Sequence, residues 1–112
     1  MKVKHRDEGK VSILQPKGKF LGGADTGELD EKLYALRGLG RVKIVLDLSE
    51  TDWMNASGIA ILIHHLKKFK EAGGDIKLSG LTRNIEKILV IARLTLVFEV
   101  YDDVKSAIAS FA

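Results

Sequence analysis

A nearly unbroken apolar run in the middle of the chain is the feature that most limits its fold. Over residues 42–48, apolar side chains follow one another almost without alternation: Val42, Ile44, Val45, Leu46 and Leu48. A strand with one face in water would alternate apolar and polar residues, so this pattern indicates a strand that helices cover on both faces. We therefore expect this segment to be a central strand of an α/β sheet.

Weaker periodic patterns precede this strand. Residues 1–6 and 10–20 each roughly alternate on either side of Gly9, which predicts an antiparallel pair of strands at the N-terminus. The loop 21–27 follows, and Asp25 stands three residues before Glu28, the spacing of a capping box at the start of a helix. That helix is expected to end near Gly38, and its buried face is expected to contain Leu29, Leu33 and Leu36.

Strands and helices are predicted to alternate after residue 42. A helix that ends at Gly73 and Gly74 is followed by a strand at 75–81, a helix at 83–94, a strand at 96–102 and a helix at 103–112. Right-handed crossovers between such elements give a mostly parallel sheet. The sequence predicts one domain over residues 1–112, with a mixed, mostly parallel sheet of about five strands, an N-terminal antiparallel pair and about four helices.

Composition narrows the range of functions. The chain has 112 residues, no cysteine and a net charge of +3, with lysines dispersed among acidic residues. It can therefore form neither disulfides nor thiolate metal sites, and nothing in it resembles a basic nucleic-acid-binding surface. No apolar run approaches the roughly 18 residues needed to cross a bilayer, so we expect a cytoplasmic protein without membrane insertion. The sequence leaves the oligomeric state open between a monomer and a weak dimer.

Small polar residues gather where the central strand leads into the next helix, in the stretch WMNASGIA at 53–60. Either Asn55 or Ser57 can cap the helix, and Gly58 keeps its first turn free of side-chain bulk. At 100° per residue, the expected core stripe is Ile59, Leu62, Ile63 and Leu66, and an opposite row contains Ser57, Ile61, His64 and Lys68. This row is a candidate docking surface, and a capping role alone is the alternative.

Catalytic and metal-binding readings of the same stretch fail on spacing. His64 lies about 10 Å along the helix axis from Ser57 at 1.5 Å per residue, too far to act as its base. His64 and His65 point about 100° apart, so we expect both to be solvated rather than to bind a metal. The glycine-rich segment LGGADTG at 21–27 precedes a helix and keeps phosphate binding open, although it is not a P-loop.

The segment VKIVLDLSETDWMNASGIAILI at 42–63 resembles the signature of the STAS domain family, named for sulfate transporters and anti-sigma factor antagonists. In that family, a strand ending in Asp-Leu-Ser leads through a loop with Ser or Thr before Gly to a helix. The segments LSGL, IEKILVIARL, VFEVYDD and VKSAIASF then follow in the family's order. The resemblance covers nearly the whole chain.

The resemblance implies a regulatory function. In bacterial anti-sigma factor antagonists, the serine before the glycine is phosphorylated by the partner anti-sigma factor, a serine kinase, and Ser57 occupies that position. The unphosphorylated protein would bind the anti-sigma factor and free a sigma factor, and a PP2C-like phosphatase would reverse the modification. The chain would be a switch that needs no cofactor and is not an enzyme. The expected partner-binding residues are Asn55, Ala56, Ser57, Gly58, Ile61, His64, Lys68, Gly22 and Gly23.

The sequence departs from the family pattern around this serine. Asn55 replaces a frequent Asp and Ala56 a frequent Ser, which leaves Ser57 as the only hydroxyl in the loop itself. Leu21 stands where Asp is common, in a loop that usually borders the partner surface. An alternative function is a STAS scaffold or regulatory subunit of a signalling or transporter complex, in which Ser57 only caps the helix.

Overall fold

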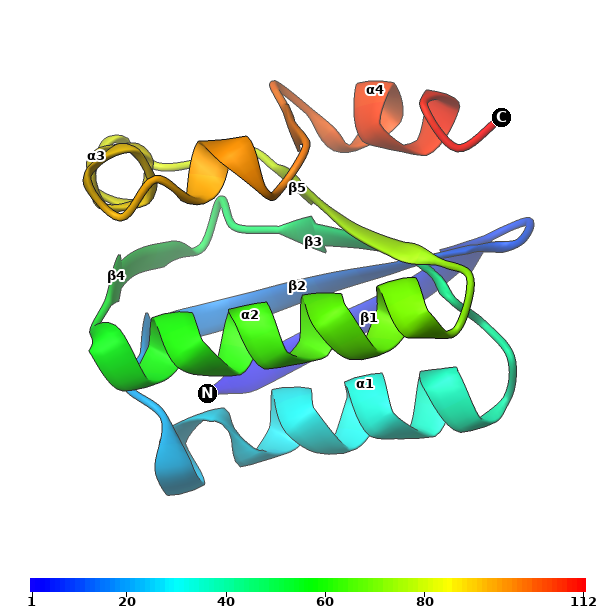
Figure 1. Cartoon of the computed structure of the whole chain (residues 1–112), viewed down its shortest axis with the longest axis horizontal. Helices are drawn as coiled ribbons and strands as arrows, with labels where there is room; N and C mark the ends of the chain where they lie inside the picture. The colour runs from blue at the N-terminus through cyan, green and yellow to red at the C-terminus, as the bar shows by residue number, and fades with distance from the viewer.

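The six strands lie in one mixed sheet that has helices on both faces (Figure 1). The structure, a computed structural model, describes residues 1–112. In chain order the elements are β1 (Lys2–Glu8), β2 (Val11–Phe20), the 3-10 helix η1 (Gly23–Thr26), α1 (Gly27–Gly38), β3 (Lys43–Asp47), β4 (Thr51–Met54), α2 (Ala56–Glu71), β5 (Asp75–Ser79), α3 (Arg83–Ile91), the 3-10 helix η2 (Leu94–Leu96), β6 (Val100–Tyr101) and α4 (Val104–Ala109).

The strand order is β1-β2-β3-β5-β6, and β4 pairs with the end of β2. Only β1 and β2 are antiparallel, and all other pairings are parallel. The single α/β domain, its antiparallel pair at the N-terminus and the central place of β3 are therefore confirmed.

Alternating side chains of the sheet supply two cores of unequal size. On β3, Ile44 and Leu46 belong to the larger core, which α1, α2 and α3 cover, whereas Val45 belongs to the smaller core beneath α4. On β5, Leu78 points into the larger core, and the buried Lys77 donates from Nζ to the Ser110 hydroxyl at 2.8 Å after α4. Helices thus cover β3 on both faces, as its apolar run predicts.

The start of α1 differs from the prediction. No capping box forms, because the N-cap residue is Thr26 and its side chain makes no capping hydrogen bond. The Glu28 carboxylate instead accepts the backbone N–H of Val3 at 2.6 Å and so ties α1 to β1. The buried face is confirmed and consists of Leu29, Leu33 and Leu36.

The buried face of α2 is rotated from the predicted stripe. Leu62 and Leu66 are buried as expected, but Ile63 is 43% exposed and His65 only 8% exposed. The predictions for Ile63 in the core and for His65 in solvent are therefore wrong. The physical reason is that α1 packs beside α2 and presents Asp30 to the His65 ring, which extends the buried arc toward α1.

Two strand predictions also needed correction. The strand β4 was not predicted, because its central residues Asp52 and Trp53 are both exposed and break the alternation of an edge strand. The strand expected at 96–102 is only Val100–Tyr101, since Leu96 belongs to η2 and residues 97–99 form an irregular turn after it. The sheet consequently has six strands where about five were expected.

The first turn of α2 packs directly on the backbone of β2. A Cβ added at Gly58 would lie 2.2 Å from the carbonyl oxygen of Phe20, and the backbone N–H of Asn55 donates to that same oxygen at 3.0 Å. Only a residue without a side chain permits this approach. The prediction that Gly58 keeps the first turn of the helix free of side-chain bulk is therefore confirmed. A side chain is excluded there because α2 contacts the backbone of β2.

We predict that Gly58→Ala lowers the free energy of unfolding by about 1–3 kcal/mol, because the added methyl group overlaps the Phe20 carbonyl. Gly27→Ala is the matched control in the first turn of α1, where nothing lies within 4 Å of an added Cβ. The control should raise stability by about 0.4–1 kcal/mol. Urea unfolding of both variants tests this, and equal stabilities would contradict the close approach.

Candidate functional site

The helix α2 begins with a side-chain cap from Asn55. The backbone of Asn55 is extended, and the side-chain oxygen of Asn55 accepts the N–H of Gly58 at 2.9 Å. This is the geometry of an N-cap residue, which satisfies one of the free N–H groups at a helix start. Of the two predicted capping residues, the structure assigns the role to Asn55 and leaves Ser57 without it.

Ser57 is the second residue of α2 and is exposed to solvent. Its hydroxyl makes no hydrogen bond within the chain, and no acidic residue occurs in the first turn of the helix. The loop after β2 lies against it: Gly22 has φ 81°, and a Cβ there would lie 2.7 Å from the Cβ of Ser57. Ser57 therefore packs closely against the Gly22 loop while its hydroxyl remains free.

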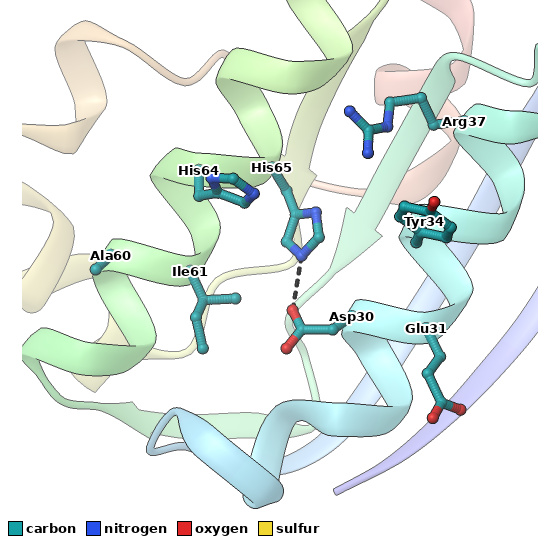
Figure 2. Close-up of a pocket in the computed structure, with 8 residues that line it drawn as sticks. All are labelled: Asp30, Glu31, Tyr34, Arg37, Ala60, Ile61, His64 and His65. Carbon is teal, nitrogen blue, oxygen red and sulfur yellow. Dashed lines mark hydrogen bonds and ion pairs between the residues drawn. The ribbon is translucent and has the colours of Figure 1, made fainter.

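A groove of about 600 Å³ runs between α1 and α2 (Figure 2). Ile61 and His64, two members of the predicted row, line its α2 side, and Tyr34 and Arg37 line its α1 side. The Arg37 guanidinium lies 5.5 Å from the centre of the Tyr34 ring, a cation–π contact between two residues of α1. We name this surface the α1/α2 groove.

A half-buried pair joins the two helices within the α1/α2 groove. The Nε2 atom of His65 lies 2.6 Å from the carboxylate of Asp30, as the dashed line in Figure 2 marks. The carboxylate is an acceptor, so the ring N–H donates. This hydrogen bond links one helix directly to the other across the groove.

The structure brings most of the predicted partner-binding residues to one end of the molecule. Gly22 lies against Ser57 with Gly23 next to it in the chain, and the cap Asn55 and the exposed Ala56 directly precede Ser57. Ile61 is only half-buried and continues this surface into the α1/α2 groove together with the exposed His64. Lys68 does not line the groove, and its Nζ lies 3.8 Å from the Glu71 carboxylate.

Sequence reasoning missed one contribution to this surface. It comes from α1, where Tyr34 lines the groove and stands beside Leu33 but outside the buried leucine face. An aromatic residue on the polar side of an amphipathic helix is the signal that could have revealed it.

Neither a base beside Ser57 nor a set of metal ligands is found at the site. Ser57 makes no hydrogen bond to a base, and no group of three or more His, Cys, Asp or Glu side chains is placed to hold a metal ion. Residues 23–26 of the glycine-rich segment form η1, in which the Asp25 N–H donates to the Gly22 carbonyl and the Thr26 hydroxyl to that of Gly23. None of the helices is both long and apolar enough to cross a membrane.

The architecture is that of a known class of α/β domains. Its sheet is parallel except for the antiparallel edge strand β1, and the start of α2 is exposed beside the glycine loop that follows β2. The family model described as STAS domain matches residues 4–107, so the chain belongs to the STAS domain family. The family expected from the central strand and the loop after it is confirmed.

Three similar proteins illustrate the relationship. A Bordetella bronchiseptica protein named as an anti-sigma factor antagonist, BtrV, is 23% identical over 91 residues, which cover 81% of this chain and 78% of that protein. A crystal structure of a Thermotoga maritima protein described as an anti-sigma factor antagonist has a TM-score of 0.83 at 21% identity, covering 96% of this chain and 92% of that one. The Bacillus cell fate determinant SpoIIAA in its phosphorylated form has a TM-score of 0.76 at 12% identity, covering 99% and 100%.

We predict that Asn55→Ala lowers the free energy of unfolding by about 1 kcal/mol, because it removes the hydrogen bond to the N–H of Gly58. The free energy of unfolding of Ser57→Ala should stay within about 0.5 kcal/mol of that of the unmodified chain, because the Ser57 hydroxyl is exposed and makes no hydrogen bond. Thermal unfolding followed by circular dichroism compares the two. A larger loss for Ser57→Ala than for Asn55→Ala would return the capping role to Ser57.

Proposed function

We propose that this chain is an anti-sigma factor antagonist and that phosphorylation of Ser57 switches its binding. In the unphosphorylated state it binds an anti-sigma factor that is itself a serine kinase, and so releases a sigma factor for transcription. The observation that carries the proposal is the free, exposed hydroxyl of Ser57 at the start of α2, in a STAS domain whose capping role is filled by Asn55.

The surroundings of Ser57 suit a residue that gains a phosphate. Phosphoserine carries about −1.5 to −2 charges, and the N-terminus of a helix stabilises negative charge by roughly 0.3–1 kcal/mol. No acidic side chain in the first turn of α2 opposes it. The fold should therefore tolerate the phosphate. The kinase would supply the base, nucleotide and magnesium, and a PP2C-like phosphatase would remove the group.

The same charge would act differently in a complex. A partner that packs over Ser57 and the α1/α2 groove would bury a neutral hydroxyl at little cost. A phosphate at that position must lose its water or face repulsion, and every 1.4 kcal/mol of such cost lowers affinity about tenfold. Loss of about 3 kcal/mol is enough for a switch of more than 100-fold. A scaffold role resting on Ser57 as the cap has no support, because Asn55 makes the capping bond.

We predict that incubation with ATP and an anti-sigma kinase of the host adds one phosphate to the chain, and that Ser57→Ala abolishes this gain. Intact-mass spectrometry measures it. Ser49→Ala is the matched control, because Ser49 is an exposed serine in the turn before β4. Thr51 is buried and donates its hydroxyl to the carbonyl of Pro16 at 3.1 Å, so it is a poor acceptor. Full phosphorylation of Ser57→Ala would refute the assignment.

We predict that Ser57→Asp weakens binding to the anti-sigma partner at least about tenfold, or 1.4 kcal/mol, because the carboxylate must be desolvated where a hydroxyl fits. The stability of the isolated domain should not fall, since a negative charge is favourable at a helix start. Ser49→Asp should bind like the unmodified chain. Calorimetric titration decides between the outcomes, and equal affinities of the two Asp variants would favour a scaffold without a switch.

A further inference from the structure

A second groove, of about 820 Å³, lies on the other flank of α2, between its C-terminal half and η2. Its floor contains the buried Leu66 and Leu94, and its rim contains Ile63, Leu96 and Val97. All three rim residues are large aliphatics exposed to solvent, and Leu96 is 80% exposed. Several such residues gathered around a hollow mark an interaction surface rather than scattered surface apolars. We name this surface the η2 groove.

Two cations with no ion-pair partner border the η2 groove. Lys67 stands on the α2 side and Arg93 on the η2 side. The other charged residues there are already paired: Lys70 lies 3.7 Å from the Asp75 carboxylate, and Glu71 lies 3.8 Å from Lys68. The free charge of the rim is therefore positive on both sides, and its complement is an acidic partner.

The backbone at Arg93 supports a use for its side chain. Arg93 has φ 59° and is the only residue other than glycine with a positive φ. This position follows the last turn of α3, where glycine is the favoured residue because it has no Cβ. An arginine costs backbone energy there. The chain carries that cost and places a guanidinium at the rim of an apolar groove.

We propose that the η2 groove binds an acidic amphipathic helix of a partner protein, as a docking surface separate from the Ser57 face. Apolar side chains of such a helix would fill the hollow, and its flanking carboxylates would meet Lys67 and Arg93. A flat bilayer surface would leave the hollow empty. A second copy related by a two-fold axis would bring the same cations together, because such an interface pairs a surface with itself.

The helical phase of α2 separates the two surfaces. At 100° per residue, Ile63 and Lys67 lie on the opposite flank of the helix from Ile61. Figure 1 shows α2 running between α1 and the segment that contains α3 and η2. One helix could therefore contact two partners at once, with the switch at its N-terminus on one side and the η2 groove on the other.

The test is a nuclear magnetic resonance titration of the full, ¹⁵N-labelled chain with two synthetic peptides of about 18 residues that share one leucine face. One peptide carries glutamates beside that face and the other carries lysines. The glutamate peptide should shift the amide signals of residues that line the η2 groove and bind at least about tenfold more tightly than the lysine peptide. No shifts in the groove, or equal affinities, would overturn the proposal.

Three variants make the assignment specific. Leu96→Gln should lower affinity for the glutamate peptide at least about tenfold, whereas Ile91→Gln should not change it, because Ile91 is 82% exposed on α3 but lies outside the groove. Arg93→Gly should weaken binding while the melting temperature is kept, because glycine accepts the positive φ. An equal loss in Ile91→Gln would overturn the proposal.

Two further measurements test whether a second copy of the chain or a lipid membrane occupies the η2 groove instead. Sedimentation equilibrium of the unmodified chain should give a monomer, and a dimer that Leu96→Gln abolishes would assign the groove to a second copy instead. Vesicles of phosphatidylcholine and phosphatidylglycerol should not bind the chain. Binding to these vesicles without binding to the glutamate peptide would assign the surface to a membrane and overturn the proposal.

Discussion

The contact of the first turn of α2 with the end of β2, with no side chain between them, is the constraint on which the candidate site depends. Gly58 makes it possible, and the Phe20 carbonyl, which accepts the Asn55 N–H, fixes its direction. Because the helix start is anchored by backbone atoms and by an asparagine cap, no part of this anchor uses the Ser57 hydroxyl. A residue that must change its chemical state without unfolding the domain is best placed where stability does not depend on it, and Ser57 meets that condition.

The packing of α2 then determines what surrounds Ser57. One arc of the helix faces the sheet, and the two flanks of that arc border the α1/α2 groove and the η2 groove. On the flank toward α1, a half-buried hydrogen bond between His65 and Asp30 adds a polar link to the apolar packing of the two helices. Partners on the two flanks would share one rigid helix, so a change at its N-terminus alters one surface and leaves the other intact.

Sequence reasoning pointed to the candidate site through local rules and missed what depends on distant contacts. The unbroken apolar run around Ile44 and the glycine at position 58 follow from burial and close packing, which a single segment can reveal. The capping-box prediction was wrong because Glu28 bonds to Val3, far away in the chain. Likewise, the helical period predicted for α2 was correct, but its buried face depended on Asp30 of another helix. His65 is therefore buried and Ile63 exposed, the reverse of the prediction.

The identity of the cap bears on how a phosphate would be received. An aspartate cap carries a full negative charge that already compensates the positive end of the helix dipole and would repel a phosphate two residues away. The Asn55 amide accepts the same Gly58 N–H without that charge. With no acidic residue in the first turn, the positive end of α2 remains available to a negative group at Ser57. The replacement of the family's frequent aspartate by asparagine therefore keeps the cap and lowers the electrostatic cost of the modification that the proposed switch requires.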